Sequence, residues 1–193
     1  MAKFLSLPRR SLGIGGPRLA LTALFLLLVS LLNFPATLAT SYWINTALLF
    51  AGGGVGFVLV ELDHLLYALL AAPHELSSQR ITSFLRQKKV KASLALLADT
   101  VSERRKLFFH SALFQLLFLA VVLFVISSSA SFFGKGLVLA FSLQLLFKQL
   151  QEYQSQGQIT SWFWNFRLNL TPTTQQLYLW GLFALHLLFA LWA

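Results

Sequence analysis

Long blocks of apolar residues recur along this chain, and they limit what it can fold into. The apolar residues form continuous runs of about 20, the length an α-helix needs to cross a hydrocarbon core of roughly 30 Å. Hydrophobic residues make up 57% of the 193 residues and charged residues only 11%, whereas a soluble domain carries about 25% charged residues. The sequence therefore predicts an integral membrane protein, and it excludes a soluble globular domain and a disordered chain.

The apolar blocks predict an all-α, polytopic transmembrane bundle of about five spans. We expect one transmembrane domain over 19–193, with spans at about 19–34, 43–64, 107–127, 136–150 and 176–193. Residues 1–18 form a basic tail that contains Lys3, Arg9, Arg10 and Arg18. A basic start, an apolar core and small residues also resemble a signal peptide over 1–39, but the long basic region favours a retained anchor.

Lys and Arg side chains predict the orientation, because they gather in cytoplasmic loops. They are concentrated in the tail and in a basic loop at 74–106, which places both in the cytoplasm. In that loop Leu94, Leu97, Ala98 and Val101 follow helical spacing, so we expect a short amphipathic helix on the bilayer or on the ends of the spans. His74 and Glu75 follow Pro73 and are typical of a solvated helix start.

Two further segments carry packing and interface signals. Gly52 and Gly56 form a Gly-x-x-x-Gly pair, which lets another helix approach closely. The segment 151–174 is polar and aromatic, with Trp162, Trp164 and Arg167 suited to the membrane interface. A lone histidine in the last span, His186, predicts a neutral interhelical hydrogen bond.

The net charge and the cysteine count exclude several classes of function. The chain has no cysteine, which removes disulfides, thiolate metal sites and cysteine nucleophiles. Its formal net charge is +9, but in a membrane protein a basic excess marks cytoplasmic loops and anionic headgroups rather than nucleic acid. We therefore expect no nucleic-acid partner and anionic lipid along residues 80–106.

Polar side chains converge at the cytoplasmic ends of three predicted spans. Span two ends in one set, span three begins with a second, and span four ends with a third: Glu61, Asp63 and His64; His110, Ser111 and Gln115; Gln144 and Lys148. Because these span ends share one side of the membrane, the topology alone predicts that the side chains lie at one depth. Ionisable residues within spans are costly and mark candidate functional sites.

Carboxylates and imidazoles are donors for Zn²⁺, Mn²⁺ or Fe²⁺. Glu61 and His64 share a helix face, and His110 would complete three protein ligands, leaving a position for an activated water. Asp63 would be a further ligand, or it would orient an imidazole. The alternative is structural, with Asp63 or Glu61 paired to Lys148 or Arg105 and His110 as a hydrogen-bonding group in the bundle.

Short motifs between residues 60 and 150 resemble the YdjM-like membrane-bound metal-dependent hydrolase family. Val60-Glu61-Leu62-Asp63-His64 resembles the family's P-D-[IL]-D-H run, and His110-Ser111 ends a segment in the place of its H-R-G-x-T-H-S motif. Gln144 and Lys148 stand where the family has His and Asp. The resemblance implies a related fold with Asp63, His64 and His110 in the metal positions.

Two functional hypotheses follow. The first is a metal-dependent hydrolase acting on a phosphorylated or lipid-linked substrate, with Glu61 as ligand or general base. Its anion-binding residues would be Lys148, Gln144, Ser111 and Arg105. The second is a nonenzymatic protein of the inner (plasma) membrane, whose polar cluster is structural and whose basic loop binds anionic lipid or a protein partner, including another membrane protein or a second copy.

Overall fold

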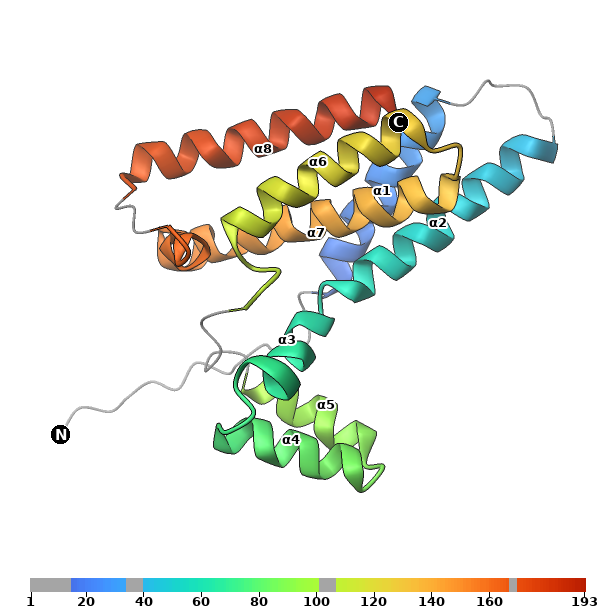
Figure 1. Ribbon diagram of the computed structural model, residues 1–193. Helices are drawn as coiled ribbons and strands as arrows, with labels where there is room; N and C mark the ends of the chain where they lie inside the picture. Colours follow the sequence, from blue (N-terminus) through green and yellow to red (C-terminus); the bar gives the residue numbers. More distant parts are fainter. Residues whose placement is uncertain (1–14, 34–39, 101–106, 167–169) are drawn as a thin grey trace.

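The computed structural model describes residues 15–33, 40–100, 107–166 and 170–193, and this part of the chain is helical without a β-strand (Figure 1). The long helices are α1 (Gly15–Asn33), α2 (Thr40–Leu59), α6 (Ala112–Ser128), α7 (Phe132–Gln156) and α8 (Pro172–Trp192). The short ones are α3 (Leu62–Leu66), η1 (Tyr67–Ala71), α4 (Leu76–Arg86), α5 (Val90–Asp99) and η3 (Thr160–Phe163). The predicted all-α class is confirmed.

Helix α7 is the centre of the bundle. It contacts α1, α2, α6 and α8, and α1 also contacts α8; Figure 1 shows α6 and α8 running along α7. Its middle, from Val138 to Leu146, is buried throughout. Only residues 129–131 separate α6 from α7, so these two helices run antiparallel.

Glycines bring α2 and α7 into close contact. A Cβ atom on Gly52 would overlap the carbonyl oxygen of Phe133, one on Gly56 that of Leu137, and one on Gly136 that of Leu49. The two backbones therefore meet without side chains between them. The predicted packing role of the Gly52 and Gly56 pair is confirmed, and Gly136 supplies the matching position on α7.

Three helices are long and apolar enough to cross a membrane in the described part of the chain: Gly16–Asn33, Thr40–Ala71 and Pro172–Trp192. Helix α6 is apolar but shorter, with 17 residues. Helix α7 is not among the three, although it has 25 residues. Helix α7 is more polar than these three helices. Its polar side chains Ser142, Gln144 and Gln149 face other helices and are buried.

The helix boundaries differ from the expected spans at the ends that carry polar residues. Helix α6 begins at Ala112, so residues 107–111 of the expected span 107–127 precede it. Helix α7 extends to Gln156, well into the segment expected to be an interfacial loop. Trp162 of that segment is buried, with 1% of its surface exposed, because it packs onto the bundle. The tail residues 1–14 lie outside the described residues.

His186 forms the interhelical hydrogen bond expected of it. Its Nδ1–H donates to the carbonyl oxygen of Leu182 (2.8 Å), so its Nε2 accepts from the Ser142 hydroxyl of α7 (2.9 Å). Both side chains are fully buried. The pair therefore joins α8 to α7 inside the bundle.

Replacing His186 with leucine should lower the free energy of unfolding by about 1 kcal/mol, the usual value of a hydrogen bond between membrane helices. The Ser142 hydroxyl loses its interhelical partner, while the volume of the side chain is nearly kept. Unfolding by SDS in mixed micelles measures the change. A variant as stable as the wild type would show that the bond does not stabilise the bundle.

Candidate functional site

Asp63 occupies the junction between α2 and the segment that leads to α6. Helix α2 ends at Leu59, two residues follow in a turn, and α3 begins at Leu62. This break directs Asp63 into the protein, where only 1% of its surface is exposed. A buried carboxylate at this position needs hydrogen-bond donors, and the chain just before α6 supplies them.

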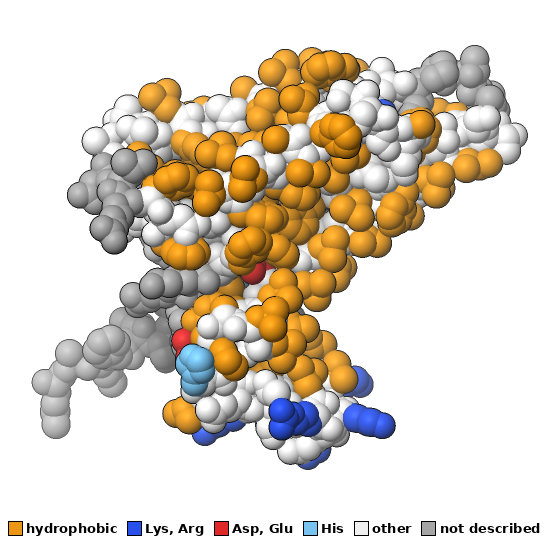
Figure 2. Space-filling view, in the orientation of Figure 1, with side chains coloured by type: hydrophobic (Ala, Val, Ile, Leu, Met, Phe, Trp, Pro, Cys, Tyr) orange, Lys and Arg blue, Asp and Glu red, His pale blue; other side chains and the backbone are white. Residues whose placement is uncertain are grey.

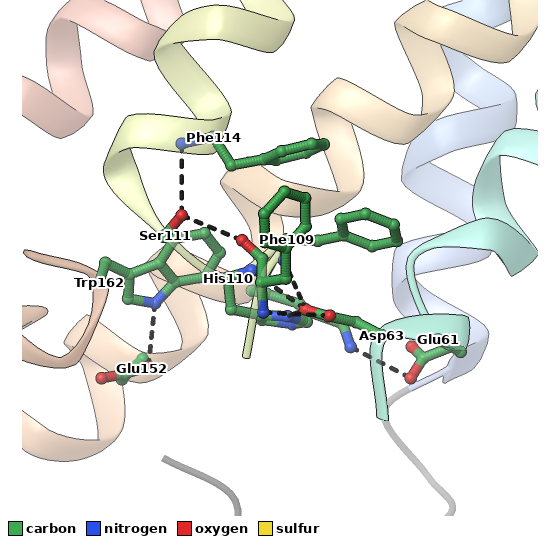
Figure 3. Close-up of polar contacts among 10 residues, drawn as sticks. Glu61, Asp63, Phe109, His110, Ser111, Phe114, Glu152 and Trp162 are labelled. Atoms are coloured by element: carbon green, nitrogen blue, oxygen red, sulfur yellow. Dashed lines mark hydrogen bonds and ion pairs between the residues drawn. The ribbon is translucent and has the colours of Figure 1, made fainter. Parts of the chain in front are cut away.

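The Asp63 carboxylate accepts hydrogen bonds from three successive backbone amides. Its Oδ1 accepts from the N–H of Phe108 (3.1 Å), and its Oδ2 accepts from those of Phe109 (2.8 Å) and His110 (3.2 Å). The Nδ1 of His110 lies 2.7 Å from the same Oδ2 (Figure 3). The Asp63 side chain therefore holds residues 108–110, which lead into α6, and Ser111 is the N-cap of that helix.

His110 connects the carboxylate to an aromatic group. Since Nδ1 faces a carboxylate, this nitrogen carries the proton and donates it. The ring lies 5.6 Å from that of His64 and 5.2 Å from that of Trp162, measured between centroids. Burial lowers the pKa of His110 below its ordinary value, although the bond to Asp63 opposes this shift. The neutral imidazole is therefore favoured.

Glu61 forms a separate group of ion pairs beside the hydrogen bonds of Asp63. Its Oε2 lies 3.1 Å from Lys148 Nζ, and its Oε1 lies 3.5 Å from Arg18 Nη2. The Glu61 side chain is 48% exposed, whereas those of Lys148 and Arg18 are 12% and 18% exposed. The group joins α1, the end of α2 and α7, as the structural alternative expected for Glu61 and Lys148.

The remaining predicted site residues have separate positions. Ser111 is the N-cap of α6: its hydroxyl accepts from the Phe114 N–H and donates to the Phe108 carbonyl. Gln144 donates to the Thr22 hydroxyl of α1, one turn deeper in the bundle than Lys148. Gln115 accepts from Gln149 and Tyr178. Arg105 lies outside the described residues.

Four residues contribute to this region that were not expected there from the sequence: Trp162, Glu152, Ser161 and Arg18. The Trp162 indole N–H donates to Glu152 Oε2 (3.0 Å), as Figure 3 shows. The Ser161 hydroxyl donates to the other oxygen of the same carboxylate. Trp162 thereby closes over His110. The sequence contained one indication of this contribution: Glu152 lies four residues, and so one helical turn, after Lys148 on α7. Arg18, expected in the tail, is the fourth, and it lies beside Glu61.

Several of the side chains expected to bind a metal already have partners within the protein. Asp63 accepts four hydrogen bonds and His110 Nδ1 donates one of them, while Glu61 faces two cations. Within the described ranges, no group of three or more His, Asp or Glu side chains is arranged to hold a metal ion. The hydrogen bonds of Asp63 join α3 to the segment that precedes α6.

Comparisons of the chain with protein-family models, with curated proteins and with solved structures find no match. The resemblance to the YdjM-like family therefore stays a prediction from short motifs, of which Asp63-His64 and His110-Ser111 are the matching parts.

Proposed function

We propose that this chain is a five-span protein of the inner (plasma) membrane that binds anionic lipid through a basic helical hairpin, with its N-terminus in the cytoplasm. The hairpin consists of α4 and α5, residues 76–99. The observation that carries the proposal is the composition of its surface: exposed Lys and Arg side chains stand next to exposed leucines. The polar cluster at Asp63 has a structural role in this proposal.

The basic residues support the orientation. Within the described ranges, one end of the bundle carries Arg18, Lys148 and the hairpin, and Lys135 is the basic residue at the other end. Figure 2 shows the Lys and Arg side chains gathered over the hairpin, whereas hydrophobic side chains cover the visible face of the bundle. Such asymmetry is the usual mark of the cytoplasmic side.

The hairpin has the features of an interfacial element. Ser78, Ile81 and Ser93 are buried between its helices and the adjoining segment. Outward, Leu76 is 75% exposed and Leu94 57%, and five basic side chains are exposed with them: Arg80, Arg86, Lys88, Lys89 and Lys91. Apolar side chains that enter the headgroup region and cations that attract anionic lipid together favour surface binding.

Metal-dependent hydrolysis, the first hypothesis from the sequence, has less support. It requires Asp63, His64 and His110 to face one ion, yet the carboxylate of Asp63 is directed to backbone amides. Metal analysis of the purified full chain separates the two functions. About one equivalent of metal that is lost in His64→Ala and His110→Ala would favour the hydrolase and contradict the structural role proposed for the cluster.

Lipid binding by the hairpin is testable with a single fluorescent label. Because the chain has no cysteine, Gln87→Cys at the turn between α4 and α5 gives a unique labelling site. In reconstituted bilayers, brominated phosphatidylglycerol should quench the label more strongly than brominated phosphatidylcholine. The preference should fall as salt is raised, because exposed charges are screened.

A charge-neutralised variant provides the control. Lys88, Lys89 and Lys91 are each expected to contribute about 1 kcal/mol near an anionic surface, so replacing all three with glutamine should remove most of the preference. Lys135→Gln, at the other end of the bundle, should leave it unchanged. Equal quenching by the two lipids at low salt would contradict the proposal.

A further inference from the structure

A pocket of about 440 Å³ opens in the hairpin, where the start of α4 meets the end of α5. Its lining combines one acid, one base, two hydroxyl groups and two leucines: Glu75, Arg80, Ser77, Thr100, Leu76 and Leu96. A volume of this size suits a small ligand or the headgroup of a larger one. Leu76 and Arg80 also belong to the exposed surface of the hairpin, whereas Asp63 and His110 do not line the pocket.

The two charged groups of the pocket are not paired with each other. The Glu75 carboxylate accepts a hydrogen bond at Oε1 from the Tyr67 hydroxyl (2.8 Å), which fixes it and leaves Oε2 for another donor. Arg80 is exposed and makes no hydrogen bond or ion pair with another described residue. The pocket thus presents a carboxylate and a guanidinium separately, with leucines beside them.

We propose that this pocket binds the zwitterionic headgroup of a phospholipid that carries a phosphate and a primary ammonium, as in phosphatidylethanolamine. The inference rests on the proposed function, because the hairpin must lie at the membrane surface for a headgroup to reach it. Arg80 donates to the phosphate, for which a guanidinium is well shaped. The first turn of α4, at Leu76 and Ser77, adds backbone N–H groups that favour an anion.

Glu75 selects the second charge of the headgroup. A primary ammonium has N–H donors for a carboxylate, whereas the quaternary ammonium of phosphatidylcholine has none, and phosphatidylglycerol has no cation. Leu76 and Leu96 border the charged groups and contact the start of the acyl chains. Basic side chains elsewhere on the hairpin attract anionic lipid generally, so the pocket adds a preference that charge alone does not give.

Native mass spectrometry of the full chain in detergent, with equal amounts of phosphatidylethanolamine, phosphatidylcholine and phosphatidylglycerol, tests the assignment. We expect wild type to retain phosphatidylethanolamine about tenfold over the other two, the value of one charge-assisted hydrogen bond. Arg80→Gln and Glu75→Gln should each abolish this preference. Arg86→Gln and Asp99→Asn make the same charge changes on exposed hairpin residues outside the pocket. Arg86→Gln should weaken the retention of phosphatidylglycerol, because Arg86 belongs to the basic surface, but both variants should keep the preference for phosphatidylethanolamine.

The remaining outcomes separate the pocket from the basic surface. If phosphatidylglycerol is retained best and Arg80→Gln and Arg86→Gln weaken it equally, the proposed function stands and the pocket assignment is wrong. If the wild type prefers none of the three lipids, both are wrong. Free phosphoethanolamine should displace phosphatidylethanolamine; retention that it leaves unchanged would assign binding to the acyl chains and overturn the headgroup pocket.

Discussion

Asp63→Asn is expected to lower the free energy of unfolding by about 3 kcal/mol, because breaking up a buried charged hydrogen-bond group leaves its donors unsatisfied. The carboxylate now accepts from three backbone amides and from His110. Asparagine keeps one acceptor oxygen, and its NH₂ group faces donors instead of accepting from them. SDS titration in mixed micelles measures the loss.

Glu61→Gln is the matched control for this variant. It removes the same charge two residues away, but the Glu61 side chain is 48% exposed, so water replaces its ion pairs. We expect a loss of less than about 1 kcal/mol. If the two variants were equally stable, the contacts of Asp63 with residues 108–110 would not stabilise the fold, and the structural role proposed for Asp63 would be wrong.

Gly52→Ala should destabilise the bundle by about 3 kcal/mol, the upper end for overpacking a well-packed core. The new methyl group overlaps the Phe133 carbonyl group, and backbone atoms cannot move aside as a side chain can. Helices α2 and α7 must separate, which loosens contacts along the centre of the bundle. The same unfolding assay reads out the change.

Gly54→Ala, on the same helix, isolates the cause. No described heavy atom outside its own helical backbone and chain neighbours lies within 4 Å of a Cβ added at Gly54, so alanine fits there. It should stabilise α2 by about 1 kcal/mol through its better helix propensity. Equal effects of the two substitutions would mean that close contact between α2 and α7 does not depend on Gly52.

Much of the fold was predictable because long apolar runs admit few solutions in a membrane. The all-α class, a helix in the basic loop and a packing role for Gly52 and Gly56 follow from run length and spacing. The boundaries near polar residues were predicted less well. Helix α6 starts at Ala112 rather than before His110, since Asp63 takes the amides of residues 108–110 as hydrogen-bond donors.

The sequence predicted which end of the bundle carries the candidate site, but it did not predict which side chains bond to one another there. Asp63 follows the end of α2 and His110 precedes the start of α6, and the two side chains meet there, as their positions in the sequence indicate. Local spacing did not reveal that Asp63 turns to the backbone before α6. The pair of Glu61 and Lys148 was one of the alternatives, but the second cation beside Glu61, Arg18, was not expected. Those choices depend on the break after Leu59, which orients neighbouring side chains differently.

By itself, the sequence determined that the chain forms long apolar helices, because apolar runs of this length are stable only where lipid or protein replaces water. The tertiary structure alone decided the partners of the polar groups: Trp162 over His110, Gly136 against α2, and a carboxylate and a guanidinium facing one pocket. Hydrophobic burial depends on composition and is nearly non-directional. Hydrogen bonds and close backbone contacts depend on distances of a few ångströms between segments far apart in the chain, which spacing along one segment does not contain.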